Sequence, residues 1–240
     1  MERLIARLLT LMIILSSVIM TNHASVSAAT GIEAKTDEYV HAWMERNQFS
    51  GTLLLARDGE ILVSKGYGMA NYEHDIPNTQ QTKFRIGSLT KSFTATAIMM
   101  LQKQDKLNIN DPLNKYIPDY PNGDKIQLLH LLTHTSGIPD HTELPGFYEN
   151  RRVYPCEITE TIATFKDLPL EFTPGEKFSY SSSGYILLGY IIEQMTGMPY
   201  GEFVRQNIFE PLEMEDSGFE HANQVIPGMA SGCDYLDNTL

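Results

Sequence analysis

The chain has 240 residues, of which 42% are hydrophobic and 20% are charged. These proportions are typical of a globular protein and exclude a disordered tail or a fibrous repeat. The net charge of −12 argues against a nucleic-acid partner, because binding to phosphate requires a basic surface.

The N-terminal segment 1–28 predicts a secretory signal peptide. Arg3 and Arg7 precede an apolar run from Leu8 to Met20, and small residues follow at positions 26–29. This is the order of the charged, apolar and cleavable parts of such a signal. The alternative is an uncleaved signal that tethers the chain to a membrane. Both interpretations predict an exported protein that works in the extracellular space, the cell wall or the periplasm.

The folded part is expected to begin with a helix and a β-hairpin. Apolar side chains recur at helical spacing across Thr36–Arg46. Two β-rich runs follow, Gly51–Arg57 and Glu60–Tyr67, and Asp58-Gly59 between them favours a two-residue hairpin turn. Because a hairpin alone is marginally stable in water, the predicted sheet is incomplete.

Helical patterns dominate the rest of the chain. Apolar spacing, capping residues, and glycine and proline stops predict five further helices. They are Leu89–Lys103, Ile126–Thr133, Glu157–Lys166, Ser183–Thr196 and Pro199 to about Asn207.

Ser88 and Lys91 form the first candidate pair for catalysis. Ser88 stands at the entrance of a predicted helix, and positions i and i+3 share a helix face, so the two side chains can meet. A desolvated amine can take a proton from a serine and activate it as a nucleophile. The start of the helix also offers backbone N–H groups to an anionic intermediate. Taken alone, the pair also fits a capping serine and a surface lysine.

The surrounding sequence resembles the serine β-lactamase and penicillin-binding protein superfamily. The segment Phe84–Phe93 contains its Ser-x-x-Lys pattern as Ser88-Leu89-Thr90-Lys91. Further stretches are similar to the class C β-lactamase and D-alanyl-D-alanine carboxypeptidase branch, and they occur in the order of that family: Leu128–Pro139, Phe172–Gly175 with Phe178–Ser181, and Ser183–Gly189.

The resemblance gives roles to two further residues. Tyr180 falls where this branch carries its Tyr-x-Asn motif, which implies that its phenol lies near Lys91 and carries protons to and from Ser88 and the leaving group. Ser182 occupies the position of the asparagine in that motif and is expected at the substrate-binding site. Its hydroxyl is shorter than an asparagine amide, so the positioning of a substrate amide is expected to change.

The resemblance also implies a fold. The family has a mixed α/β (α+β) architecture, an antiparallel sheet flanked by helices with a mostly helical lobe, and an active site in the cleft between them. This predicts one β-lactamase-like domain over residues 29–240. No Lys-Thr-Gly occurs in the chain, and the late strands of the family are expected to be missing. The chain is therefore expected to correspond to the N-terminal two-thirds of such a protein and to be impaired by truncation.

The implied function is serine acyl hydrolysis through a Ser88 acyl-enzyme, without a cofactor. The expected substrates are D-alanyl peptides of peptidoglycan or β-lactams. A secreted esterase with the same nucleophile is a second hypothesis, and a non-catalytic, truncated family member is a third. The first two differ in whether penicillin blocks ester cleavage.

The histidines and cysteines raise two further possibilities, a metal site and a disulfide. His130, His134 and His141 have spacings that can suggest zinc, but the pattern lacks the adjacent glutamate of a metalloprotease, so packed or capping histidines are favoured and no metal is predicted. The resemblance makes the segment from His134 to Gly137 a structural turn. Cys156 and Cys233 can form a disulfide only if their Cα atoms come close, which the sequence leaves open.

Overall fold

The computed structural model describes residues 31–147, 157–221 and 224–232. These residues divide into two compact units. The first takes in those up to Phe84 and those from Ile226 onward, and the second runs from Arg85 to Val225. The predicted signal over 1–28, together with Cys156 and Cys233, lies outside the described residues. Of the helices in the described part, none combines the length and apolar character needed to cross a membrane.

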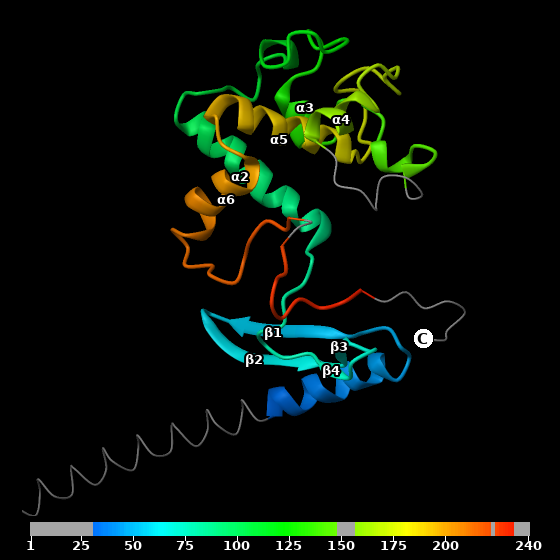
Figure 1. Ribbon diagram of the computed structural model, residues 1–240, viewed down its shortest axis with the longest axis vertical. Helices are drawn as coiled ribbons and strands as arrows, with labels where there is room; N and C mark the ends of the chain where they lie inside the picture. Colours follow the sequence, from blue (N-terminus) through cyan, green and yellow to red (C-terminus); the bar gives the residue numbers. More distant parts are fainter. Residues whose placement is uncertain (1–30, 148–156, 222–223, 233–240) are drawn as a thin grey trace, which may run out of the picture. The chain divides into compact units, whose positions relative to one another are not determined.

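The first unit contains the predicted β-hairpin (Figure 1). Strand β1 (Gly51–Arg57) pairs antiparallel with β2 (Glu60–Tyr67), with the bounds expected from the sequence. The turn between them has Asp58 at φ 53° and Gly59 at φ 82°. Positive φ at both central residues is the mark of a type I′ turn, whose twist matches that of the strands. The Asp58-Gly59 dipeptide therefore determines this turn.

A helix over residues 31–44 accompanies the hairpin in the same unit. It begins before Thr36, the predicted start. Its Asp37 carboxylate accepts hydrogen bonds from Lys65 Nζ at 2.8 and 2.9 Å and from the Tyr67 hydroxyl at 2.8 Å. Both partners lie on β2, so these contacts attach the helix to the hairpin.

Both sheets of the described residues have two strands. The second pairs β3 (Met69–Asn71) with β4 (Ile76–Pro77). On the β1–β2 hairpin, Val63 is buried, whereas Leu54 and Ile61 are 61% and 65% exposed. Part of the apolar surface of the hairpin therefore faces solvent.

The second unit contains all five of the further predicted helices (Figure 1). They are α2 (Thr90–Lys103), α3 (Leu128–Leu132), α4 (Ile158–Ala163), α5 (Ser182–Thr196) and α6 (Tyr200–Val204). The end of α5 follows the sequence most directly. Gly197 takes φ 69° and its N–H donates to the Glu193 carbonyl at 2.8 Å, as a glycine cap does.

The predicted bounds of the shorter helices are wrong by a few residues. Ile126 is not helical, because its carbonyl accepts the Leu113 N–H at 2.7 Å and the next residue bridges to Pro112. Pro199 is the cap of α6 rather than its first residue, and α6 passes at Arg205 into a π-helical turn. Hydrogen bonds to another segment therefore delay the start of α3, and a change of helix type ends α6 early.

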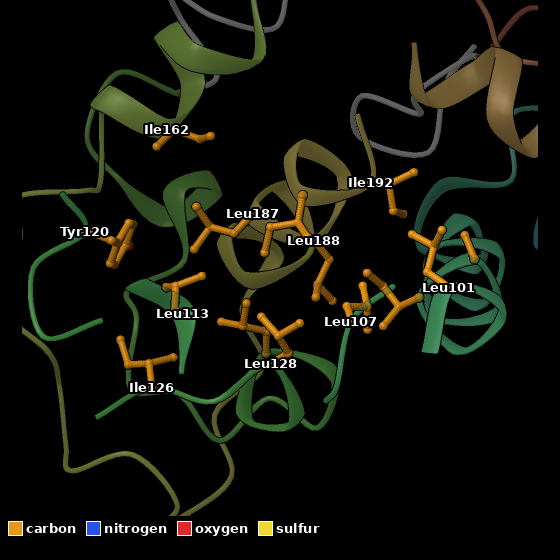
Figure 2. Close-up of a cluster of buried hydrophobic side chains, with 14 of the residues drawn as sticks. Leu101, Leu107, Leu113, Tyr120, Ile126, Leu128, Ile162, Leu187, Leu188 and Ile192 are labelled. Atoms are coloured by element: carbon orange, nitrogen blue, oxygen red, sulfur yellow. The ribbon is translucent and has the colours of Figure 1, made fainter. Parts of the chain in front are cut away.

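The core of the second unit is formed by apolar faces of α2, α3 and α5 (Figure 2). Leu187 and Leu188 of α5 are fully buried, and they lie among Leu101 of α2 and Leu128 of α3 in this cluster. The near-continuous apolar sequence of α5 is explained by this central place, since a helix with neighbours on several sides buries most of its surface. The core thus fixes the start of α5 relative to α2.

We expect Leu187→Ala to lower the free energy of unfolding by about 2–5 kcal/mol, because a fully buried leucine leaves both lost apolar contacts and a cavity. Chemical denaturation followed by circular dichroism measures this loss. Leu212→Ala is the matched control, because Leu212 is 65% exposed, and we expect a change within about 0.5 kcal/mol. Equal effects of the two substitutions would contradict the placement of Leu187 in the core.

Candidate active site

Ser88 lies in a single turn of 3-10 helix, Gly87–Leu89, that leads directly into α2. The sequence placed Ser88 at the entrance of this helix, and the structure agrees, although Leu89 belongs to the turn rather than to α2. Gly87 takes φ 52°, a conformation that glycine adopts without a steric cost. The Ser88 side chain is exposed.

Lys91 stands one turn after Ser88, at the start of α2. Its Nζ donates a hydrogen bond to Ser88 Oγ at 3.2 Å and makes a longer contact of 3.5 Å with Ser182 Oγ. The same ammonium lies 4.9 Å from the centre of the Tyr180 ring. A cation this close to an aromatic face is held by the negative charge on that face. Lys91 therefore contacts all three of the other predicted site residues.

Tyr180 completes the group from the segment that precedes α5. Its hydroxyl donates to Ser88 Oγ at 2.7 Å, across 92 positions of sequence. The pKa of Tyr180 is lowered from its ordinary value: burial raises it, but its hydrogen bonds with Lys91 and Ser88 and the charge of Lys91 lower it by more. A phenol with a lowered pKa gives up its proton at a lower pH than an ordinary tyrosine, and the phenolate can then serve as a base.

Ser182 is the first residue of α5, and its backbone is held by a buried carboxylate. The Ser182 N–H donates to Asp140 Oδ2 at 3.0 Å. Asp140 is only 8% exposed, and its other oxygen accepts from the backbone and the hydroxyl of Thr142, both at 2.9 Å. Burial raises the pKa of Asp140, but the hydrogen bonds from the N–H groups of Thr142 and Ser182 lower it by more. The net pKa is below the ordinary value, so the carboxyl stays charged.

A second contact fixes the start of α5 against the same segment. Ser183 is fully buried, and its hydroxyl donates to the Pro139 carbonyl at 2.7 Å and accepts from the His141 N–H at 2.8 Å. Together with the Asp140 contact, these two hydrogen bonds hold the residues just after Tyr180 to the loop that follows α3.

The structure thus brings together all four residues singled out from the sequence, and it adds Asp140, which sequence reasoning missed. The partner of Asp140 in α5, Ser182, lies 42 positions further along the chain, and no spacing rule connects the two residues. The residues around it, from Ser136 to Thr142, mix polar and apolar types, so nothing in the sequence marked this carboxylate as buried.

The three histidines considered for zinc are placed separately. His130 Nδ1 accepts the Gln127 N–H at 3.2 Å, whereas His141 Nδ1 lies 3.2 Å from Ser183 Oγ. His134 packs on Tyr180. Within the ranges that the structure describes, no three His, Cys, Asp or Glu side chains are grouped so as to hold a metal ion.

The geometry is that of an activated hydroxyl. Ser88 Oγ has a phenol at 2.7 Å and an ammonium at 3.2 Å. The positive charge stabilises the phenolate form of Tyr180, and this phenolate can then accept the proton of the serine. This arrangement supports nucleophilic attack by Ser88 on a carbonyl group.

We expect Lys91→Met to raise the pKa of Tyr180. The substitution removes a hydrogen-bond donor and a positive charge that both stabilise the phenolate. Ultraviolet titration of tyrosinate measures this, with the signal of Tyr180 obtained as the difference between each protein and its Tyr180→Phe counterpart. Lys103→Met, at the far end of α2, is the control and should leave the titration of Tyr180 unchanged. An unchanged titration in Lys91→Met would contradict the contact.

Comparisons with known proteins agree on one family. The model of the family described as Beta-lactamase matches residues 36–237. The PbpX protein of Bacillus subtilis (strain 168) is 37% identical over 212 residues, which cover 83% of this chain and 51% of that protein. The teichoic acid D-alanine hydrolase of Staphylococcus aureus (strain MRSA252) is 29% identical over 201 residues, covering 84% of this chain and 49% of the relative.

A solved structure shows the same similarity in three dimensions. The crystal structure of a penicillin binding protein from Bacillus halodurans superposes with a TM-score of 0.74 at 33% identity, and the match covers 83% of this chain and 62% of that one. The chain therefore spans about half the length of the two curated relatives, at 51% and 49%.

Proposed function

The chain belongs to the Beta-lactamase family, and we propose that it is a serine acyl hydrolase in which Ser88 is the nucleophile. The observation that carries this proposal is the position of Ser88 Oγ, within hydrogen-bond distance of both the Tyr180 hydroxyl and Lys91 Nζ. Of the groups that touch Ser88, the phenol is the natural base, because its pKa is lowered and it can act as a phenolate.

The proposed reaction has two stages. Ser88 Oγ attacks the substrate carbonyl carbon, and its proton passes to the Tyr180 phenolate. Tyr180 then gives this proton to the leaving group as the bond between that group and the carbonyl carbon breaks, which leaves an acyl ester on Ser88. Water attacks the ester in the second stage, loses a proton to Tyr180, and the same proton returns to Ser88 as the acid is released. The Lys91 ammonium stabilises the phenolate.

For substrates we propose D-alanyl peptides of peptidoglycan or β-lactams. The name of the staphylococcal relative, a teichoic acid D-alanine hydrolase, supports a D-alanyl group as the acyl part. The predicted signal at residues 1–28 supports an exported protein that meets such a substrate in the cell envelope. The family resemblance of the Ser-x-x-Lys segment supports penicillin as a probe of the same nucleophile.

A secreted esterase is the second candidate function, and one residue favours it. Ser182 stands where the family motif has asparagine, and its short hydroxyl already faces Lys91 at 3.5 Å. An asparagine side chain offers both a donor and an acceptor to a substrate amide, whereas this hydroxyl offers less. Esters need fewer such contacts, because their leaving group is an oxygen without an N–H.

We expect a fluorescent penicillin or an active-serine phosphonate to modify the full chain, and peptide mapping of the adduct to place the label on Ser88. Preincubation with unlabelled penicillin separates the two functions: it should block the cleavage of a nitrophenyl ester if the site accepts β-lactams and leave the ester rate unchanged in an esterase that excludes them. A label on another serine would contradict the proposed nucleophile. No label with either probe would also contradict it and would favour a non-catalytic family member.

A further inference from the structure

His134 forms an unusual set of contacts around Tyr180. The two rings are stacked, with centroids 4.5 Å apart and planes inclined by 28°. The backbone of His134 takes φ 57°, a left-handed conformation that costs energy for a residue with a Cβ and that histidine, asparagine and aspartate tolerate better than most. The half-buried imidazole therefore projects from a backbone conformation that few other residue types tolerate.

Both neighbours of Tyr180 are hydrogen-bonded to this one residue. The Ser179 N–H donates to the His134 carbonyl at 2.9 Å, and the Ser181 N–H donates to His134 Nδ1 at 3.1 Å. The chain is thus attached immediately before and immediately after the tyrosine. Together with the ring stacking, these two hydrogen bonds hold the tyrosine to His134 at three points. In this position the Tyr180 hydroxyl lies 2.7 Å from Ser88 Oγ.

These contacts define the protonation state of the imidazole. Because Nδ1 accepts a hydrogen bond from a backbone N–H, it carries no proton, and the ring proton is on Nε2. The charged and titratable groups that face the ring are Lys91 from α2, Asp140 from the following loop, and Tyr180 and Tyr185. Burial and the charge of Lys91 lower the pKa of His134, and the Asp140 carboxylate raises it by less. The neutral ring is the favoured form near neutral pH.

We propose that neutral His134 is a positioning residue that holds the phenol of Tyr180 against Ser88. This inference rests on the proposed function, in which Tyr180 carries the serine proton. Protonation of His134 puts a hydrogen on Nδ1 against the Ser181 N–H, so the hydrogen bond is lost and the two N–H groups repel each other. Tyr180 then moves, and acylation slows as the pH falls through the pKa of His134.

Two substitutions separate the contacts of His134. His134→Asn keeps an oxygen acceptor for the Ser181 N–H and tolerates the left-handed backbone, but it does not titrate. His134→Phe keeps an aromatic ring but has no acceptor. The matched control is His130→Asn: His130 is one turn earlier, its pKa is also lowered by burial, and its Nδ1 also accepts a backbone N–H, yet it lies against Gln127 rather than Tyr180.

The first experiment reads the position of Tyr180 without using activity. In the full chain labelled with carbon-13 tyrosine and nitrogen-15 histidine, nuclear magnetic resonance follows both side chains as the pH is lowered. We expect His134 to be neutral with its proton on Nε2, and the Tyr180 ring carbon signal to shift at the pKa of His134. That shift should vanish in His134→Asn and persist in His130→Asn. A proton on Nδ1, or a Tyr180 signal that ignores the titration of His134, would overturn the inference.

The second experiment measures acylation by the phosphonate probe. The ratio of the wild-type rate constant to that of His134→Asn should be constant at alkaline pH and should decrease when the pH drops below the pKa of His134. Only the wild-type chain gains a proton at this position, and the titration of Tyr180 is common to both chains. His134→Phe should slow acylation about 10²-fold at every pH, the scale of a displaced reacting group. The ratio for His130→Asn should not depend on pH. A constant ratio for His134→Asn would overturn the inference, whereas a wild-type chain that is never labelled counts against the proposed function and leaves the resonance experiment to decide the role of His134.

Discussion

Ser88→Ala is expected to abolish covalent labelling by the phosphonate probe and to reduce ester turnover to a small residual rate. Removing the nucleophile of a serine hydrolase costs about 10⁶-fold in kcat, because the remaining groups have no atom on which to form the acyl intermediate. In this chain the alanine leaves Tyr180 and Lys91 facing a methyl group in place of the hydroxyl that both contact. The measurements are intact-protein mass spectrometry after exposure to the probe and ester turnover.

Ser92→Ala is the matched control for this substitution. Ser92 is an exposed serine on α2, about one turn beyond Ser88. We expect Ser92→Ala to be labelled at the wild-type rate. Labelling that survives in Ser88→Ala, or that is lost in Ser92→Ala, would show that another serine is the nucleophile.

Tyr180→Phe is expected to slow acylation by about 10²–10⁴-fold, the usual contribution of a general base. The substitution keeps the ring, which is stacked on His134, and removes only the hydroxyl 2.7 Å from Ser88 Oγ. Because the ring stays, probe binding is expected to change little, and the loss should fall on the rate constant for bond formation. Rapid-mixing measurements at several probe concentrations separate the two quantities.

The pH dependence of acylation provides a second test of Tyr180. If the phenolate takes the serine proton, the rate rises with pH through the pKa of Tyr180, and this rise lies below the ordinary range of tyrosine because the pKa is lowered. The rise should be absent in Tyr180→Phe. Tyr39→Phe, which alters an exposed tyrosine of the first unit, should match the wild-type profile. A Tyr180→Phe chain that reacts at the wild-type rate would rule out the phenol as the base.

Several local features of the fold could be predicted because each is determined by neighbouring residues. Asp58-Gly59 has the residues that adopt positive φ in a two-residue turn, so the β1–β2 hairpin followed directly. Gly197 ended α5 for the same local reason. The i, i+3 spacing of Ser88 and Lys91 placed the two side chains within 3.2 Å. Hydrogen bonds made by distant segments, as at Ile126, were the cause where predicted helix bounds were wrong.

The position of Tyr180 shows where sequence reasoning needed more than local rules. Its contact with Ser88 spans 92 positions, and only the resemblance of the Tyr-x-x segment to a family motif pointed to it. The family itself is confirmed by the match over residues 36–237. The roles given to Ser88, Lys91, Tyr180 and Ser182 stay predictions, and the experiments above test them.

The sequence by itself determined the family, the order of the helices and the nucleophile candidate, because these depend on residue types at short spacing. Only the tertiary structure decided how Tyr180 is aimed. Packing of α5 against α3 brings the loop that contains Asp140 to the start of α5, where its carboxylate accepts the Ser182 N–H, and brings His134 to the segment just before. Burying a carboxylate or an imidazole is favourable only where its polar atoms find partners. Those partners belong to another element, so no local pattern in the sequence specifies them.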